Sequence, residues 1–176
     1  MQKPQLSIIV PVLNEQTMLN KLFAHLKNNQ YNANDTEIIV VDGGSKDKTI
    51  GVAKKYGVTI LHSKKGRAVQ MNTGAAQANG AILYFLHADT FPPLHFDKII
   101  KNAVANGHGT GCFRMRFDTD NLMLRMFAWF SRIDHVLCRG GDQSLFVTKP
   151  IFYEQGGFNE AYLIYEDGEF IRRLYQ

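Results

Sequence analysis

The chain has 176 residues, of which 45% are hydrophobic and 20% charged, and its formal net charge at pH 7 is +4. This composition excludes the fibrous and intrinsically disordered classes, and the length suffices for one hydrophobic core, so we expect a single domain over residues 1–176. The apolar run at residues 6–13 is too short to span a membrane and has no cleavage signal, so we expect a cytoplasmic protein.

The first half of the chain alternates strand-like and helix-like segments. Four short apolar runs without polar alternation are typical of strands buried on both faces of a parallel sheet. They lie at residues 6–10, 37–41, 58–61 and 81–86. Helical spacing or helix-forming composition marks residues 18–26, 49–56 and 67–78 between them. This alternation predicts an α/β fold, with a mostly parallel, Rossmann-like sheet and helices on both faces.

The second half of the chain is less regular. Residues 99–104 fit one face of a helix, residues 112–117 alternate like a half-exposed strand, and residues 144–147 predict another strand. The apolar segment 122–133 is open to three interpretations: an interfacial helix on a membrane, a core helix or a dimer face. The chain stops at Gln176 inside a helix-like segment without a stop signal, so we expect further residues in the natural protein.

The fourth predicted strand ends in a histidine and a carboxylate two residues apart, His87 and Asp89. Side chains at positions i and i+2 of an extended segment point the same way, so both would face one ligand. Open α/β sheets bind nucleotides at this carboxyl end of their strands. In the alternative interpretation, Asp89 caps the turn before Pro92 and His87 ends a buried strand.

Polar residues and glycines follow the first two predicted strands. The first loop contains Pro11, Asn14 and Glu15, and the second contains Asp42 and Gly43. Glycines let backbone amides approach a ligand closely, and an aspartate at a strand end accepts hydrogen bonds from a base or a ribose. Ordinary turn chemistry explains the second loop equally well. Its glycine spacing matches neither a dinucleotide fingerprint nor a phosphate-binding P-loop.

Arg67 follows Lys65 and Gly66 at the start of a predicted helix. Free amides and the positive end of the helix dipole favour anions there, and a guanidinium adds a bidentate phosphate donor. Solvated charge before a helix is the alternative.

Near the C-terminus, three carboxylates fall within four positions, at Glu166, Asp167 and Glu169. Such a cluster is costly unless it is solvated, paired or bound to a metal, and it can raise one pKa enough to create a general base. An acidic helix N-terminus also explains it.

Together these segments resemble family 2 glycosyltransferases of the GT-A fold in order and spacing. The resemblance rests on residues 6–15, 37–49, 66–74, 86–90, 156–160 and 166–167. Within the family, the chain is most similar to the radical-SAM/selenodomain-associated transferase 2 subgroup. That narrower resemblance rests on residues 66–68, 70–72, 86–90 and 141–143.

The resemblance implies a role for each matching position. Pro11, Asn14, Glu15, Asp42 and Gly43 would bind the nucleotide, with Asp42 at the base and Arg67 and Asp89 beside them. Asp89 would hold a divalent metal on the diphosphate, Asp167 would be the catalytic base, and Glu166 would support it. Residues 1–90 would form the nucleotide-binding half, and residues 91–176 the acceptor and catalytic half.

The chain departs from the family at His87, which occupies the position of the first aspartate in the metal-binding Asp-x-Asp. Loss of one negative charge lowers metal affinity unless the diphosphate supplies most of the ligands. A neutral imidazole ligates Mn²⁺ but suits Mg²⁺ poorly, so with His87 as a second ligand we favour Mn²⁺ over Mg²⁺.

These roles predict a metal-dependent, inverting transfer of a sugar from a nucleotide-diphospho-sugar to an acceptor. The acceptor is unknown, a lipid-linked acceptor at the inner face of the membrane being one candidate, and Arg139, Asp142 and Gln143 would lie near it. We expect no nucleic-acid partner. The sequence leaves open whether the protein forms a homo-oligomer. Nucleotidyl transfer and noncatalytic nucleotide or partner binding are the alternatives.

Overall fold

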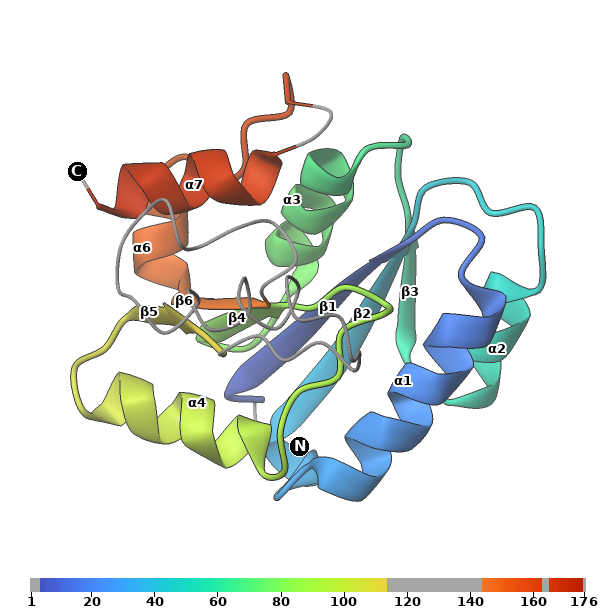
Figure 1. Ribbon diagram of the computed structural model, residues 1–176, viewed down its shortest axis with the longest axis horizontal. Coiled ribbons are helices and arrows are strands. Elements are labelled where there is room, and N and C mark those ends of the chain that lie inside the picture. Colours follow the sequence, from blue (N-terminus) through green and yellow to red (C-terminus); the bar gives the residue numbers. More distant parts are fainter. Residues whose placement is uncertain (1–3, 114–143, 163–164, 176) are drawn as a thin grey trace, which may run out of the picture.

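The structure is a computed structural model, and it describes residues 4–113, 144–162 and 165–175 (Figure 1). Its centre is a six-stranded sheet in the order β3-β2-β1-β4-β6-β5. The strands are β1 (Leu6–Val12), β2 (Thr36–Asp42), β3 (Thr59–His62), β4 (Ile82–Phe85), β5 (Thr110–Cys112) and β6 (Leu145–Thr148). The four strands β3, β2, β1 and β4 are parallel, while β6 runs antiparallel to both β4 and β5. The predicted mostly parallel α/β sheet is confirmed.

Helices connect these strands along the chain. They are α1 (Gln16–Asn29), the short 3₁₀ helix η1 (Ala33–Asp35), α2 (Thr49–Lys55), α3 (Arg67–Gln77), α4 (Phe96–Ala105), α6 (Lys149–Glu154) and α7 (Glu166–Leu174). All but η1 and α6 fall on segments predicted to be helical. Helix α6 was not predicted because it is only six residues long, although Pro150 in its first turn is a typical start signal.

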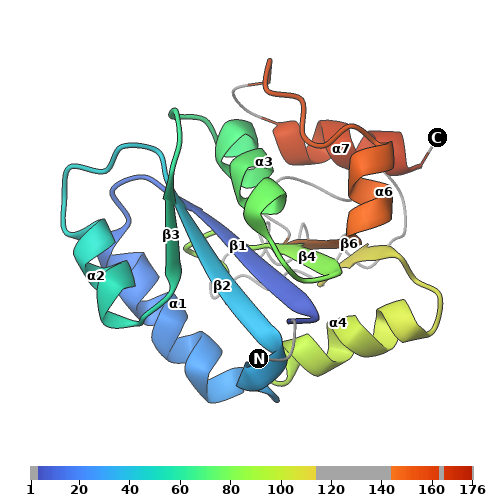
Figure 2. The same cartoon turned by 180° about the vertical axis from the view of Figure 1, so that it is seen from behind.

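Two hydrophobic cores lie on the two faces of the sheet. One core joins residues of β1 such as Ile8 and Val10 to α1, α2 and α4, and the other joins Ile9 to α3, α6 and α7. Successive residues of a strand point to opposite faces, so a strand that is buried on both faces must be apolar throughout. Both figures show helices on each side of the sheet (Figures 1 and 2). The prediction of helices on both faces is confirmed.

One strand prediction starts two residues too late. β5 spans Thr110–Cys112, whereas the sequence predicted a strand over residues 112–117, most of which lie outside the described residues. Thr110 pairs with Val147 and Cys112 with Leu145. Pairing with β6 therefore decides where this strand lies, and a partner that follows more than thirty residues later cannot be recognised from local alternation.

The strand order reverses between β1 and β4, which places a topological switch point at their carboxyl ends. From β1 the chain builds β2 and β3 on one side, then returns to place β4 on the other. The last β1–β4 ladder bond runs from the Leu86 N–H to the Ile9 carbonyl. Pro11, two residues further along β1, has no N–H to extend the ladder. The two strand ends thus separate at the point where open α/β sheets bind their ligands.

Within the described ranges, the structure contains no helix long and apolar enough to cross a membrane.

Candidate functional site

A cavity of about 360 Å³ opens at the switch point. Pro11, Val12, Leu13, Glu15, Lys65, Gly66, Arg67, Gln70, His87, Ala88 and Asp89 line it. It combines the carboxyl ends of β1 and β4 with the N-terminus of α3, three places that are far apart in the sequence. Five of the predicted site residues, namely Pro11, Glu15, Arg67, His87 and Asp89, lie on this one cavity.

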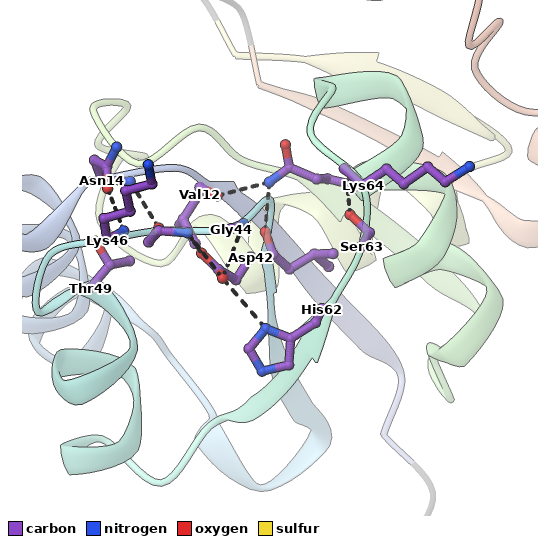
Figure 3. Close-up of polar contacts among 12 residues, drawn as sticks. Val12, Asn14, Asp42, Gly44, Lys46, Thr49, His62, Ser63 and Lys64 are labelled. Atoms are coloured by element: carbon purple, nitrogen blue, oxygen red, sulfur yellow. Dashed lines mark hydrogen bonds and ion pairs between the residues drawn. The ribbon is translucent and has the colours of Figure 1, made fainter.

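Hydrogen bonds join the loop after β1 to the loop after β2 (Figure 3). The Asn14 side chain accepts from the Lys46 N–H at 2.8 Å, and the Asn14 N–H donates to the Ser45 hydroxyl at 2.8 Å. Asn14 has a left-handed backbone with φ of 58°, which asparagine tolerates better than most residues. In this structure Asn14 links the two loops and is not among the residues that line the cavity.

Asp42, at the end of β2, is buried and holds its own loop. Its carboxylate accepts from the Ser45 N–H at 3.0 Å and the Gly44 N–H at 3.2 Å, and its Oδ2 lies 3.4 Å from His62 Nδ1 (Figure 3). Burial acts to raise the pKa of Asp42, but the contacts with Ser45, Gly44 and His62 outweigh it and lower that pKa below its ordinary value. Asp42 is therefore a fixed anion beside the loop, and contact between this carboxylate and a base stays a prediction.

Gln70 is a site residue to which the sequence analysis assigned no role. Its buried side-chain amide donates to the Val12 carbonyl at 2.9 Å and to the Val41 carbonyl at 2.7 Å. These carbonyls lie at the ends of β1 and β2, so Gln70 ties α3 to both strands. A Cβ on Gly43 would lie 3.0 Å from Gln70 Oε1, which explains a glycine at that position. The available signal was a polar side chain on the otherwise apolar buried face of α3.

Arg67, the first residue of α3, contacts a carboxylate of α7. Its Nε lies 2.5 Å from Glu166 Oε1, with the Arg67 side chain 38% exposed and the Glu166 side chain fully buried. The contact is an ion pair without the alignment of a directed hydrogen bond, and neither Glu166 oxygen has a hydrogen-bond partner. A buried carboxylate without a countercharge is strongly unfavourable, so Glu166 depends on Arg67.

His87 makes the second contact with α7. Its Nε2 lies 3.3 Å from Asp167 Oδ2, and the two side chains are 12% and 3% exposed. Burial lowers the pKa of His87, but the hydrogen bond and the charge of Asp167 outweigh burial and raise that pKa above its ordinary value. The two residues thus favour a charged pair. Glu166 and Asp167 are not among the residues that line the cavity, but each contacts a residue that does, Arg67 or His87.

The extended segment expected over residues 87–89 is not observed. β4 ends at Phe85, and residues after it form a turn in which the Thr90 N–H donates to the His87 carbonyl. Both His87 and Asp89 line the cavity as predicted, but a turn rather than a strand brings them there. His87 directs Nε2 at Asp167, while Asp89 is exposed.

The acidic residues on the other wall favour a cation. Burial, then the charges of Asp89 and Asp47, raise the pKa of Glu15 above its ordinary value. A cation placed between these carboxylates would relieve their repulsion. Among the residues that the structure describes, no group of three or more histidine, cysteine, aspartate or glutamate side chains is arranged to hold a metal. A divalent ion at this cavity would take one or two carboxylates and complete its shell with oxygens of a ligand, the usual arrangement for Mg²⁺ with phosphates.

The predicted acceptor residues Arg139, Asp142 and Gln143 lie outside the described residues, as does the segment 122–133. The loop at residues 156–160 is described and packs on α3. The Asn72 amide donates to the Phe158 carbonyl at 2.9 Å and to Glu160 Oε1 at 3.0 Å. This loop leads into the segment before α7, so Asn72 helps to place α7 over the N-terminus of α3.

Comparisons with known proteins agree with this arrangement. The family profile described as Glycosyl transferase family 2 matches residues 7–157. Glycosyltransferase AglE of Haloferax volcanii is 31% identical over 115 residues, which cover 61% of this chain and 37% of AglE. This chain thus corresponds to only part of that relative.

Solved structures share the fold at low sequence identity. S. aureus TarS 1-349 in complex with UDP-GlcNAc has a TM-score of 0.79 at 19% identity, with 97% of this chain and 53% of that chain covered. Mannosyltransferase PcManGT from Pyrobaculum calidifontis, in complex with GDP-Man and Mn²⁺, has a TM-score of 0.67 at 18% identity, with 96% of this chain and 51% of that chain covered. The predicted GT-A fold is confirmed.

Proposed function

Because this chain belongs to glycosyl transferase family 2, we propose that it transfers a sugar from a nucleoside diphosphate sugar to an acceptor hydroxyl. The observation that carries the proposal is the convergence of Asp89, Arg67 and His87 on one cavity at the switch point of the sheet, with the Asp167 carboxylate behind His87 at 3.3 Å. The diphosphate of the donor needs positive charge around it, and the acceptor hydroxyl needs a carboxylate to take its proton. This cavity combines both.

The donor would occupy the cavity lined by β1, β4 and α3. Arg67 and Lys65 supply positive charge for the diphosphate, and the N-terminus of α3 adds free backbone amides. Asp42 and the loop after β2 would take the base. UDP-GlcNAc and GDP-Man in the complexes of TarS and PcManGT support this class of donor. Residues 1–90 would thus bind the donor. Residues 91–176, which include α7, would supply the catalytic base and bind the acceptor.

Asp89 would hold a divalent ion on the diphosphate oxygens, with Glu15 nearby. The Mn²⁺ in the PcManGT complex supports such an ion. When bound, the ion supplies Lewis-acid stabilisation of the negative charge on the departing diphosphate. Since His87 directs Nε2 at Asp167, we assign the ion to Asp89 rather than to an Asp89–His87 pair. This assignment removes the reason to prefer Mn²⁺ over Mg²⁺.

Asp167 would act as the general base. The acceptor oxygen forms a bond to the anomeric carbon while the bond from that carbon to the diphosphate oxygen breaks, and its electron pair leaves with the diphosphate. The acceptor proton passes to the Asp167 carboxylate, an effect worth roughly 10²–10⁴-fold in rate. His87 would orient the Asp167 carboxylate through the contact at 3.3 Å. One such displacement inverts the anomeric centre.

Incubation of the protein with a panel of UDP- and GDP-sugars and Mn²⁺ or Mg²⁺ tests the proposal. We expect metal-dependent release of UDP or GDP from one sugar nucleotide, and NMR of the early product should give an inverted anomeric configuration. Release of pyrophosphate from a nucleoside triphosphate and a sugar phosphate would favour nucleotidyl transfer instead. Binding of a nucleotide without any turnover would favour a noncatalytic module.

A further inference from the structure

Arg67 contacts two parts of the site at once. It lines the cavity proposed for the donor, and its Nε lies 2.5 Å from Glu166 Oε1 at the N-terminus of α7. Asp167, the proposed base, is the next residue after Glu166. Among the described residues of the cavity wall, Arg67 is the one that forms an ion pair with Glu166.

The Glu166 side chain is fully buried, and neither of its oxygens accepts a hydrogen bond. A buried carboxylate in this state needs a countercharge to hold it in place. Arg67 is the cation within ion-pair distance. The position of Glu166, and of the helix start that carries Asp167, therefore depends on where the Arg67 guanidinium lies.

Arg67 uses only part of its hydrogen-bonding capacity in this contact. A guanidinium carries five N–H donors in a rigid plane. Among the described residues, Arg67 Nε lies at ion-pair distance from Glu166, and neither terminal nitrogen of Arg67 donates a hydrogen bond. The Arg67 side chain is 38% exposed and lines the cavity, so an anion bound there would contact this side chain.

Arg173, at the other end of α7, provides a contrast. Its Nε donates to Glu169 Oε1 at 2.8 Å, and its terminal nitrogens donate to Glu169 Oε2 and to the carbonyls of Gln155 and Gly157. Every nitrogen of Arg173 therefore has a partner within the protein. Arg67, on the cavity wall, has no hydrogen-bond partner for its terminal nitrogens among the described residues.

We propose that Arg67 is a positioning residue that connects the donor to the catalytic helix. One part of its guanidinium holds Glu166, and its terminal edge binds the donor diphosphate with the bidentate geometry that guanidinium groups form with phosphate. This proposal rests on the proposed function, because it requires an anionic donor in the cavity. Coupling is reciprocal, so donor binding would order the start of α7, and Glu166 would preorganise Arg67 for the donor.

Titration calorimetry with UDP and GDP in the presence of Mn²⁺ tests the connection in the Glu166→Gln, Arg67→Ala and double variants. We expect Glu166→Gln to weaken nucleotide binding about tenfold, as for loss of a charge-assisted contact, and to have no further effect in the Arg67→Ala background. The matched control is Glu169→Gln, which removes a carboxylate from the other arginine pair of α7. Its nucleotide affinity should equal that of the wild type.

Arg67→Lys adds a test that does not require loss of the buried carboxylate. Lysine keeps the charge but cannot contact Glu166 and the diphosphate through one planar group. Rates of donor hydrolysis over a range of donor concentrations should therefore give a lower kcat as well as a higher KM. A residue that only supports folding would lower the melting temperature and leave both constants unchanged.

The outcomes distinguish this proposal from the proposed function. If the wild type bound neither UDP nor GDP, the proposed function would be wrong, and this connection would fall with it. If the wild type bound a nucleotide and folded Glu166→Gln bound it equally well, the connection alone would be overturned. Equal losses from Glu166→Gln in both backgrounds would also overturn it, because the two residues would then act independently. Should Glu166→Gln not fold, unchanged kcat and KM in Arg67→Lys would overturn it.

Discussion

Charged side chains lie at both edges of the parallel sheet, but the partners that surround these charges differ between the two edges. At the amino edge, Glu37 accepts from the Ser7 hydroxyl at 2.6 Å and from the Asn79 backbone at 2.6 Å and side chain at 3.1 Å. At the carboxyl edge, Glu166 has one ion pair and no hydrogen bond, and Glu15 has a raised pKa. A carboxylate whose oxygens all accept hydrogen bonds from the protein supports the fold. A carboxylate that lacks such partners is suited to binding a ligand.

The same contrast appears in the pKa of the two glutamates. Burial acts to raise the pKa of Glu37, but the hydrogen bonds from Ser7, Asn79 and Gly80 outweigh it and lower that pKa. Burial and the charges of Asp89 and Asp47 all raise the pKa of Glu15. Substitutions at the amino edge should therefore affect stability, and those at the carboxyl edge should affect activity.

The largest effect is expected at Asp167. Asp167→Asn keeps the shape of the side chain but removes the base, so sugar transfer should fall roughly 10²–10⁴-fold. Nucleotide affinity should change little, because the substitution leaves Arg67 and Asp89 intact. Initial rates and calorimetry on the same preparation measure both quantities. Full activity in Asp167→Asn would place the base elsewhere.

The next largest effect is expected at Asp89. Asp89→Asn should weaken Mn²⁺-dependent nucleotide binding by about tenfold or more, since the ion loses its carboxylate ligand. Binding measured without metal should be the same as in the wild type. Asp35→Asn is a suitable control, because Asp35 pairs with Lys101 away from the cavity at 2.9 Å. If nucleotide binding depended on Mn²⁺ equally in Asp89→Asn and in the wild type, Asp89 would not be the metal ligand.

The smallest effect, on stability alone, is expected at Glu37. Glu37→Gln should lower the free energy of unfolding by about 1–3 kcal/mol near neutral pH, because buried donors lose their anionic acceptor. A carboxyl with a lowered folded pKa stabilises the fold above its ordinary value of 4.5 and loses that contribution as pH falls through the folded pKa. The difference between variant and wild type should therefore shrink below pH 4.5. Denaturant titrations across pH measure it, and a loss of nucleotide binding would break the contrast between the two edges.

The sequence predicted most of the parallel half of the fold because its signals are local. Apolar runs such as residues 37–41 and the helical spacing at residues 18–26 report burial directly. Pairing with β6 determines where β5 begins, which was predicted two residues too late, and α6 was too short to show a periodic pattern. These elements depend on partners distant in the chain.

The sequence predicted which residues belong to the candidate site, but not which of their side chains contact each other. His87, Asp89, Arg67 and Glu15 lie on one cavity, as the sequence indicated. The pairing of Arg67 with Glu166 and of His87 with Asp167 joins residues about 100 and 80 positions apart, and no local pattern reports it. Gln70 was missed for a similar reason, because its role depends on carbonyls at the ends of two strands.

The most direct test of the account is a crystal structure of the protein with Mn²⁺ and the UDP- or GDP-sugar that it binds in solution. We predict the diphosphate in the cavity between β1 and β4, with the metal on Asp89, the terminal nitrogens of Arg67 on phosphate oxygens, and Asp167 facing the anomeric carbon. A donor bound elsewhere, or an Asp167 carboxylate directed away from the sugar, would contradict the account.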